Sequence, residues 1–316
     1  HAKIADYCIR QYLTKCESFE DLMAYYRQEL KAQSAAVAES VKNLFVEPAP
    51  YQSVLMRDCV ATGKDISQGG KYNNYGIHGT AFGDGVDQLA AVKDVVFDKK
   101  QLTAEAFLAK LEKNFEGDEA LLHYLRNDAP KIGRDMSAKP IGEAVLAAYG
   151  EALAGIENER GGIFRAGTGS AMYYVWHAEG MHMLSNGHKT EEDFSCNFSP
   201  SLLLSKGGPI SIVQGFSFEN VCHTCNGGPL TLELHDTVFR NEEGSKKVAM
   251  LVKTFIDLGG HQLQLNAVNA EKLRAAQLEP EKYQELIVRV WGWSAYFVEL
   301  DEAYQKHVMA RQEYVV

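Results

Sequence analysis

The most informative part of the chain lies near its carboxyl end, where residues 287–297 read IVRVWGWSAYF. The alternation in Val288-Arg289-Val290 predicts a short strand that runs into a turn at Gly292. Two of the three tryptophans of the chain, Trp291 and Trp293, flank this glycine. Glycine has no Cβ and adopts positive φ at little steric cost, so the pattern predicts a tight turn with Gly292 at its tip and bulky neighbours packed inward.

Four segments outside this turn carry further patterns. They are a helix ending in Arg311-Gln312-Glu313, the run GGHQLQLN at residues 259–266, Ser199-Pro200-Ser201 with Gly208-Pro209 downstream, and Lys71-Tyr72-Asn73-Asn74 before a glycine-rich stretch. In order and spacing, these segments and the turn resemble the C-terminal half of the pyruvate formate-lyase-like glycyl radical enzymes. The resemblance covers most of the chain. Trp291 and Trp293 depart from the family pattern, which usually has a small residue before the glycine and Tyr or Phe after it.

The resemblance implies a specific cofactor, a glycyl radical on Gly292. A separate S-adenosylmethionine-dependent iron–sulfur activating enzyme would remove one hydrogen atom from Gly292, and the radical would then pass to a cysteine thiol that attacks the substrate. Only glycine lacks the Cβ that would crowd a planar backbone radical. The loop must also be dry, and we expect a collar of aromatic side chains to exclude water. The expected collar is Trp291, Trp293, Tyr296 and Phe297.

The thiol loop of the family, a Gly-Cys-x-Glu tetrapeptide, does not occur in this sequence. Cys8, Cys16 and Cys59 are followed by Ile-Arg, Glu-Ser and Val-Ala, so none of them fits the pattern. The chain also opens with His1 instead of methionine, as a cut or processed end would. We therefore expect the C-terminal portion of a longer enzyme, or a separate piece that needs a partner carrying the Cys/Glu loop.

Composition restricts the other partners. The chain has 316 residues with 32 Lys and Arg against 42 Asp and Glu, which gives a net charge of -10. An acidic chain without long basic runs is a poor partner for nucleic acid or anionic lipid, and no uninterrupted apolar stretch approaches the roughly 18 residues of a membrane helix. Six sparse cysteines suit a reducing compartment. We expect a cytoplasmic protein with no nucleic-acid or membrane partner, and a homodimer.

The expected fold is α/β: the C-terminal half of a glycyl radical enzyme α/β barrel with a C-terminal glycyl radical domain. Residues 1–193 would form the second part of the barrel domain and residues 194–316 the glycyl radical domain, with a boundary near Phe194. Hydrophobic periodicity predicts helices at residues 18–47, 103–115, 118–127, 137–158, 245–258 and 269–287. Short β-like runs occur at residues 172–176, 210–213, 230–234 and 262–266, and the glycine-rich residues 69–85 predict a loop.

His78 is the candidate substrate-binding residue. Glycines at 76 and 79 bring the backbone close to whatever its ring faces. In the resembled family this segment reaches the substrate cavity, and in hydroxyphenylacetate decarboxylases a glutamate near this position meets the phenol. The aligned residue here is His78, or Gly79 if the gap falls otherwise. The alternative interpretation is a structural loop histidine.

Cys222-His223-Thr224-Cys225 has the spacing of half a zinc site or of a redox pair, but no second pair with zinc spacing is present. We interpret these cysteines as part of a loop that leads into the Asn226-Gly227-Gly228-Pro229 turn, and we predict no bound metal.

Three functions remain open. The leading hypothesis is radical C–C cleavage in a small organic acid, by decarboxylation of an arylacetate such as indoleacetate, because Trp291-Gly292-Trp293 and the His78 loop look most like that branch of the family. The first alternative is a glycyl radical dehydratase or lyase that acts on a diol, choline or a hydroxyproline-like substrate. The second is a non-catalytic rescue subunit that donates an intact glycine loop to a damaged enzyme.

Overall fold

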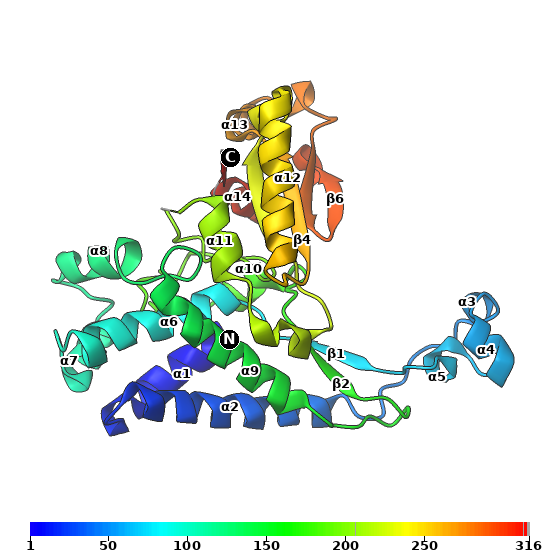
Figure 1. The fold of residues 1–316 in the computed structure, drawn as a ribbon, viewed down its shortest axis with the longest axis horizontal. Coiled ribbons are helices and arrows are strands. Elements are labelled where there is room, and N and C mark those ends of the chain that lie inside the picture. The colour runs from blue at the N-terminus through cyan, green and yellow to red at the C-terminus, as the bar shows by residue number, and fades with distance from the viewer. Residues whose placement is uncertain (206, 312, 315–316) are drawn as a thin grey trace.

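The computed structural model describes residues 1–205, 207–311 and 313–314, and its amino-terminal part is a body of helices (Figure 1). Four helices form the centre of this body: α1 (Ala2–Tyr12), α2 (Phe19–Ser40), α6 (Phe82–Val92) and α9 (Lys139–Leu153). α2 packs on α9, and α1 packs on both α2 and α6. Their buried apolar side chains belong to one continuous core, as expected of helices that each turn an apolar face toward the others.

Helix α2 begins where the sequence predicts. Ser18 Oγ accepts a hydrogen bond from the Asp21 backbone N–H at 3.2 Å, and the Asp21 carboxylate accepts one from the Ser18 N–H at 2.8 Å. This capping box satisfies two backbone donors that the helix leaves open. The prediction of a helix up to residue 47 was wrong, because α2 ends at Ser40, where Val41 leaves the helical conformation with ψ of 8°.

A parallel strand pair, β1 (Tyr75–His78) and β2 (Phe164–Gly167), emerges from the helical body. Tyr75 lies opposite Phe164 and His78 opposite Gly167. In the described ranges these strands form a sheet of two, so this chain does not close a barrel. The prediction of a loop at residues 69–85 was wrong, because β1 and the start of α6 lie within it. Gly76 allows a close approach instead of a turn: a Cβ there would lie 1.8 Å from Asn226 Nδ2.

A second parallel sheet lies in the carboxyl-terminal part, with the strand order β4 (Leu263–Val268), β3 (Leu230–His235), β7 (Glu313–Tyr314). Helix α12 (Glu242–Asp257) runs along this sheet (Figure 1). The leucines of β3 share a buried cluster with Val248, Leu251 and Phe255 of α12. The predictions of strands at 230–234 and 262–266 and of a helix at 245–258 are confirmed.

Two other strand predictions were wrong. Residues 172–176 lie at the start of helix α10 (Tyr173–Ala178), and residues 210–213 lie in helix α11 (Pro209–Gly215). In α11, Pro209 occupies the first turn, where its missing N–H has no partner to lose, and Ser211 Oγ accepts a bond from the Gly208 N–H at 3.1 Å. Short apolar runs do not separate a buried helix turn from a strand.

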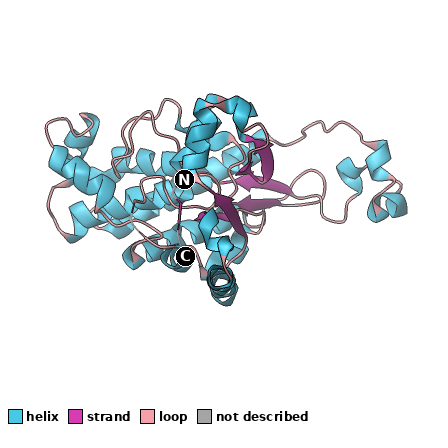
Figure 2. Cartoon of the chain, turned by 90° about the horizontal axis from the view of Figure 1, so that it is seen from above, coloured by secondary structure: helices cyan, strands magenta, loops and turns pink. Residues whose placement is uncertain are grey.

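The remaining elements complete the framework. They are α3 (Pro50–Ser53), α4 (Arg57–Thr62), α5 (Ile66–Gly69), α7 (Ala104–Glu112), α8 (Glu119–Asn127), α13 (Ala270–Leu278), α14 (Glu302–Ala310), β5 (Ile287–Trp291) and β6 (Trp293–Tyr296). The short helices α3 to α5 project away from the body (Figures 1 and 2). The predicted helix at 269–287 stops at Leu278, close to Pro280, which cannot continue a helix. None of the helices described is long and apolar enough to cross a membrane.

Candidate active site

The predicted turn at Gly292 is the tip of an antiparallel hairpin formed by β5 and β6. Gly292 has φ of 52°, in the left-handed region that favours glycine. Apart from Gly292 itself and its chain neighbours Trp291 and Trp293, no heavy atom of the described residues lies within 4 Å of the position that a Cβ at Gly292 would take. Gly292 is therefore glycine for its conformation and not for lack of space, and this unhindered centre fits a planar backbone radical.

Arg289 holds the hairpin tip from within the hairpin. Its guanidinium donates from Nη2 to the carbonyl oxygen of Gly292 at 2.7 Å and from Nη1 to Ser294 Oγ at 3.2 Å. Arg289 and Ser294 are cross-strand partners, so the side chain needs only to reach around the turn. A charge-assisted bond to the carbonyl draws electron density toward its oxygen. This polarises the backbone on one side of the Gly292 Cα.

The carboxyl ends of β1 and β2 lie beside the base of this tip. A Cβ at Gly169, just past the end of β2, would lie 2.9 Å from His78 Nδ1 and 3.9 Å from Trp291 Cζ2. The structure therefore brings the ring of His78 and the indole next to Gly292 to the same loop. The carboxyl ends of parallel strands are where α/β proteins place their ligands.

The ring of His78 is held by two loops. Asn226 Nδ2 lies 3.0 Å from His78 Nε2, and because an amide nitrogen only donates, Nε2 accepts and a neutral ring carries its proton on Nδ1. Burial lowers the pKa of His78 from its ordinary value, against a smaller opposing effect of a backbone hydrogen bond to Gly169. The lowered pKa favours the neutral form of the His78 ring.

A cavity of about 250 Å³ lies on the other side of the His78 loop. Its lining combines apolar and polar side chains, including Lys3, Ile77, His78, Tyr149, His177 and Phe194. His177 Nδ1 lies 2.8 Å from Thr80 Oγ1, which ties α10 to the loop after β1. The predicted site residue His78 therefore borders both the hairpin and a cavity of small-molecule size.

Strained backbone surrounds this region. Ala81, Ala171 and Asn197 have φ of 55°, 47° and 56°, an unusual conformation for residues with a Cβ. Asn197 is locked to the loop after β2, because its N–H donates to Ser170 Oγ at 2.8 Å and its Oδ1 accepts from the Ser170 N–H at 3.3 Å. Such strain is typical of functional sites that the surrounding structure holds in place. Neither Asn197 nor Asn226 carries a motif that sequence reasoning detects, although the glycines at 167 and 169 directly after a strand were a usable signal.

The predicted aromatic collar is only half formed in this chain. Phe297 is fully buried and Trp291 is half-buried, but Trp293 and Tyr296 are 40% and 44% exposed. Both exposed side chains belong to strand β6, at its first and last residues. For these two side chains the expectation of a water-excluding collar was wrong in the isolated chain.

The cysteines do not form a site with His78. All six are free, and Cys222 and Cys225 are exposed, with Arg165 Nη1 donating to Cys225 Sγ at 3.1 Å. Within the residues that the structure describes, no group of three or more His, Cys, Asp or Glu side chains is arranged to hold a metal ion. The absence of a bound metal stays a prediction.

The β5–β6 hairpin with Gly292 at its tip lies beside the carboxyl ends of the parallel strands β1 and β2. This arrangement is that of the carboxyl-terminal half of a glycyl radical enzyme fold. The chain belongs to the pyruvate formate lyase-like family: the model of that family matches residues 9–178, and a glycine radical domain matches residues 194–298. This domain implies a glycyl radical that is formed after translation. The division of the chain at Phe194 stays a prediction.

Known relatives agree with this assignment. The chain is 31% identical to trans-4-hydroxy-L-proline dehydratase of Clostridioides difficile over 94% of its own length and 38% of the relative. It is 27% identical to indoleacetate decarboxylase of Tractidigestivibacter scatoligenes, over 85% and 34% of the two chains. The glycerol-bound B12-independent glycerol dehydratase of Clostridium butyricum superposes with a TM-score of 0.88 at 26% identity, covering 100% of this chain and 42% of that one. The chain thus spans about two-fifths of the length of the relatives it matches.

Proposed function

We propose that this chain carries the radical glycine, Gly292, and one wall of the substrate cavity of a glycyl radical lyase. The observation that carries the proposal is that Trp291, the neighbour of the predicted radical residue Gly292, and the predicted site residue His78 both lie against Gly169 at the ends of β1 and β2. These residues are far apart in the sequence, and a purely structural turn would not need to approach the strand ends.

Each residue of this site has a distinct task in the proposal. The radical on Gly292 supplies one-electron chemistry that can break an otherwise unreactive bond. Arg289 polarises the Gly292 carbonyl through its 2.7 Å bond. Trp291 covers the base of the tip and excludes water from it. His78 adds the surface of a neutral ring to the site, because Asn226 donates to its Nε2 and the Gly169 backbone accepts its ring proton.

The first candidate reaction is elimination of a hydroxyl group from a small hydroxylated acid. The relative with 31% identity is a dehydratase, and the superposed structure is a dehydratase as well. Lys3 lies in the lining of the cavity, and the described lining residues include no Asp or Glu, so the cavity suits a carboxylate better than a cation. A neutral His78 beside it adds no negative charge that would repel a carboxylate.

The second candidate reaction is the decarboxylation of an arylacetate such as indoleacetate. It is favoured by the relative that is an indoleacetate decarboxylase and by the apolar part of the cavity lining, where Ile77, Tyr149 and Phe194 could face an aromatic ring. A rescue subunit remains the non-enzymatic alternative. It would need no cavity beside His78, so the cavity argues against it.

The proposed partners follow from the same assignment. They are a radical S-adenosylmethionine activating enzyme and the part of the enzyme that carries the Cys/Glu loop. An upstream reading frame that continues into a barrel with a Gly-Cys-x-Glu loop would rule out the rescue subunit. A cytoplasmic location and a homodimer are part of the proposal.

The test is electron paramagnetic resonance of the protein in its natural length after anaerobic activation, followed by product analysis. A glycine-type doublet that disappears in Gly292→Ala supports the assignment, and a doublet that persists in this variant contradicts it. Loss of water from a hydroxylated acid identifies the first reaction, and a methylarene with carbon dioxide from an arylacetate identifies the second. A radical without turnover of either class would contradict both.

A further inference from the structure

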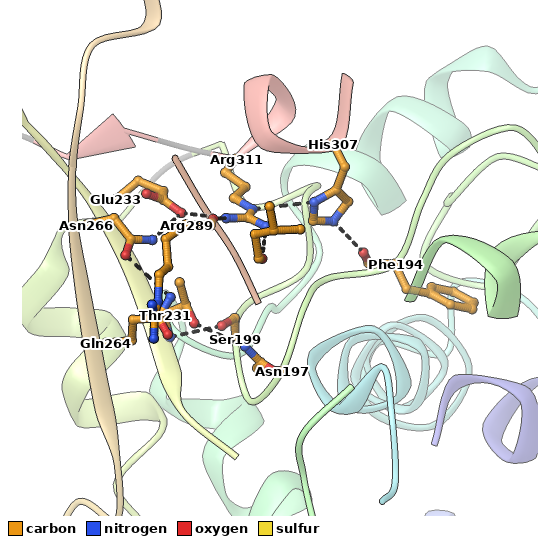
Figure 3. A network of polar contacts seen from close by, with 11 residues as sticks. Phe194, Asn197, Ser199, Thr231, Glu233, Gln264, Asn266, Arg289, His307 and Arg311 are labelled. Atoms are coloured by element: carbon orange, nitrogen blue, oxygen red, sulfur yellow. Dashed lines mark hydrogen bonds and ion pairs between the residues drawn. The ribbon is translucent and has the colours of Figure 1, made fainter. Parts of the chain in front are cut away.

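A buried ion pair between Arg311 and Glu233 lies beside strand β5, close to Arg289 (Figure 3). Arg311 follows helix α14, and its Nη1 lies 3.0 Å from Glu233 Oε1 on strand β3. The two side chains are only 5% and 6% exposed. Glu233 also accepts a bond from Asn266 Nδ2 of strand β4 at 2.9 Å. A charge buried this deeply is expensive unless every partner is in place, so Arg311 has a defined position.

Arg311 also donates hydrogen bonds to the backbone of β5 and to His307. Nη1 donates to the carbonyl of Arg289 at 2.8 Å, and Nη2 donates to the carbonyl of Val290 at 2.6 Å. Nε donates to His307 Nδ1 at 3.4 Å. A planar guanidinium with fixed N–H directions can serve two successive carbonyls and a carboxylate together, whereas a lysine ammonium is a single point of charge.

The contacted residues are those where the hairpin ladder is irregular. Arg289 pairs with Ser294 and Trp291 with Trp293, so the register shifts between them and Val290 has no cross-strand partner among the described residues. A bulge of this kind leaves a residue outside the ladder and bends the strand. Arg311 therefore supplies the hydrogen bonds that a neighbouring strand would otherwise give to β5.

The same stretch of backbone leads directly to Gly292. The Arg289 side chain donates to the Gly292 carbonyl. The backbone carbonyl of Arg289 in turn accepts a hydrogen bond from Arg311. The position of Gly292 thus depends on two guanidinium groups: that of Arg289 within the hairpin, and that of Arg311, which bonds the backbone of β5 from outside it. Only the first of them touches Gly292.

We infer that Arg311 is a positioning residue for the radical glycine: it fixes the β5 bulge to the β3–β4 sheet and so directs Gly292 to the ends of β1 and β2. This inference rests on the proposed function of Gly292. Arg311 is bonded neither to Gly292 nor to the residues that line the cavity beside His78. It acts through the carbonyls of Arg289 and Val290, and it takes no part in the chemistry of the tip itself.

The first test is Arg311→Lys in the protein in its natural length, with Arg240→Lys as the matched control. Arg240 also pairs with a carboxylate, Asp236, but the two side chains are 64% and 39% exposed. Lysine keeps the charge beside Glu233 and cannot serve both carbonyls of β5. We expect the amides of residues 288–294 to exchange hydrogen about tenfold faster in Arg311→Lys, with unchanged exchange in β3 and β4. The control should change neither.

The second test separates positioning from stability. Arg311→Met combined with Glu233→Gln removes both buried charges, and the amide that replaces the Glu233 carboxylate can still bond Asn266, so an unpaired charge no longer threatens folding. We expect this variant to fold, to show the same fast exchange at residues 288–294, and to give a several-fold lower yield of the glycyl radical signal after anaerobic activation.

The outcomes distinguish this inference from the proposed function. Slow, wild-type exchange at residues 288–294 together with a wild-type radical yield in either folded variant would overturn the role of Arg311. An absent radical in the wild-type protein would instead overturn the proposed function, while hydrogen exchange would still report whether Arg311 fixes the hairpin.

Discussion

Two kinds of glycine meet at the candidate site, and they are glycines for different reasons. At the hairpin tip, Gly292 has φ of 52° and, apart from its chain neighbours, no described heavy atom within 4 Å of a Cβ position. In the loop beside β2, a Cβ at Gly228 would lie 1.8 Å from Thr168 Oγ1 and 2.7 Å from the Thr168 carbonyl carbon. The tip is therefore open and the strand ends are crowded. At Gly228 a side chain would collide with Thr168. At Gly292 a side chain would have room, but it would strain a backbone with positive φ and would crowd a radical on the Cα.

The largest effect is expected for Gly292→Ala, and it should fall on the radical and not on folding. Alanine fits the open space, so the loss of stability is limited to about 1 kcal/mol for a left-handed residue with a Cβ. The glycyl radical signal should disappear completely. Electron paramagnetic resonance after anaerobic activation, combined with urea unfolding, measures both quantities.

Gly259→Ala is the matched control for this prediction. Gly259 also has positive φ, 75°, and open space around its Cβ position, but it lies after α12, in a different part of the carboxyl-terminal region. It should lose the same small stability and keep the full radical signal. Equal loss of signal in both variants would mean that backbone strain, and not the identity of Gly292, decides radical formation.

The second effect concerns the crowded strand ends. Gly228→Ala, at φ of 150°, forces a methyl group against Thr168 and should destabilise the protein by about 2 to 3 kcal/mol. Gly227→Ala is the neighbouring control, since its nearest contact is Gln262 Oε1 at an ordinary 3.7 Å. Urea midpoints compare the two. A Gly228→Ala variant no less stable than Gly227→Ala would show that the loop relaxes and is not crowded.

The sequence predicts the open hairpin tip at Gly292 better than the crowded ends of strands β1 and β2. A glycine between two tryptophans after an alternating strand is a local pattern, so the turn at Gly292 and its hairpin are visible without tertiary information. The parallel pair β1–β2 is not visible in this way, because its partners lie in the separate segments 75–78 and 164–167 and β1 is rich in loop-type residues. Gly76 and Gly167 of this pair admit Asn226 and His78 at close range, a packing role that the prediction of a loop at residues 69–85 does not include.

The same limit explains the missed helices and the missed supporting residues. Apolar runs of four or five residues at 172–176 and 210–213 fit a strand and a helix equally well, and packing decides between them. Asn226 and Arg311 stand in segments that the sequence marks, but their contacts are with residues far away in the chain, so the sequence does not show what they bond. Asn197 likewise acts through a distant contact, with Ser170. His78 and Gly292, by contrast, stand in short motifs that a family resemblance can identify.

A third effect should appear at the contact between helix α14 and Phe194, in the segment between α10 and α11. His307 of α14 is buried, its Nε2 lies 3.0 Å from the Phe194 carbonyl, and Nδ1 accepts from Arg311. Burial, and then the nearby charge of Arg311, lower the pKa of His307 well below its ordinary value near 6.5. Unfolded protein therefore binds more protons than folded protein below pH 6.5.

The sign of the pH effect follows from this difference. The stability that His307 contributes is present above pH 6.5 and is lost as the pH falls toward its lowered folded-state pKa. Urea midpoints measured from pH 7.5 to pH 5.5, a range of about two units around the unfolded-state pKa, should fall less in His307→Gln than in the wild type. Parallel curves for the two proteins would contradict a neutral, buried His307 at this contact.

The smallest effect distinguishes the two indoles beside Gly292. Trp291 is half-buried against Gly169, and its buried Nε1 makes no hydrogen bond within the described residues, so Trp291→Phe loses packing area alone and should cost about 1 kcal/mol. Trp293 is 40% exposed, and Trp293→Phe should stay within about 0.5 kcal/mol. Urea unfolding of both variants in the protein in its natural length gives the ranking. A larger loss of stability in Trp293→Phe than in Trp291→Phe would mean that Trp293 is the covered indole. The hairpin would then approach the substrate cavity through β6 and not through β5.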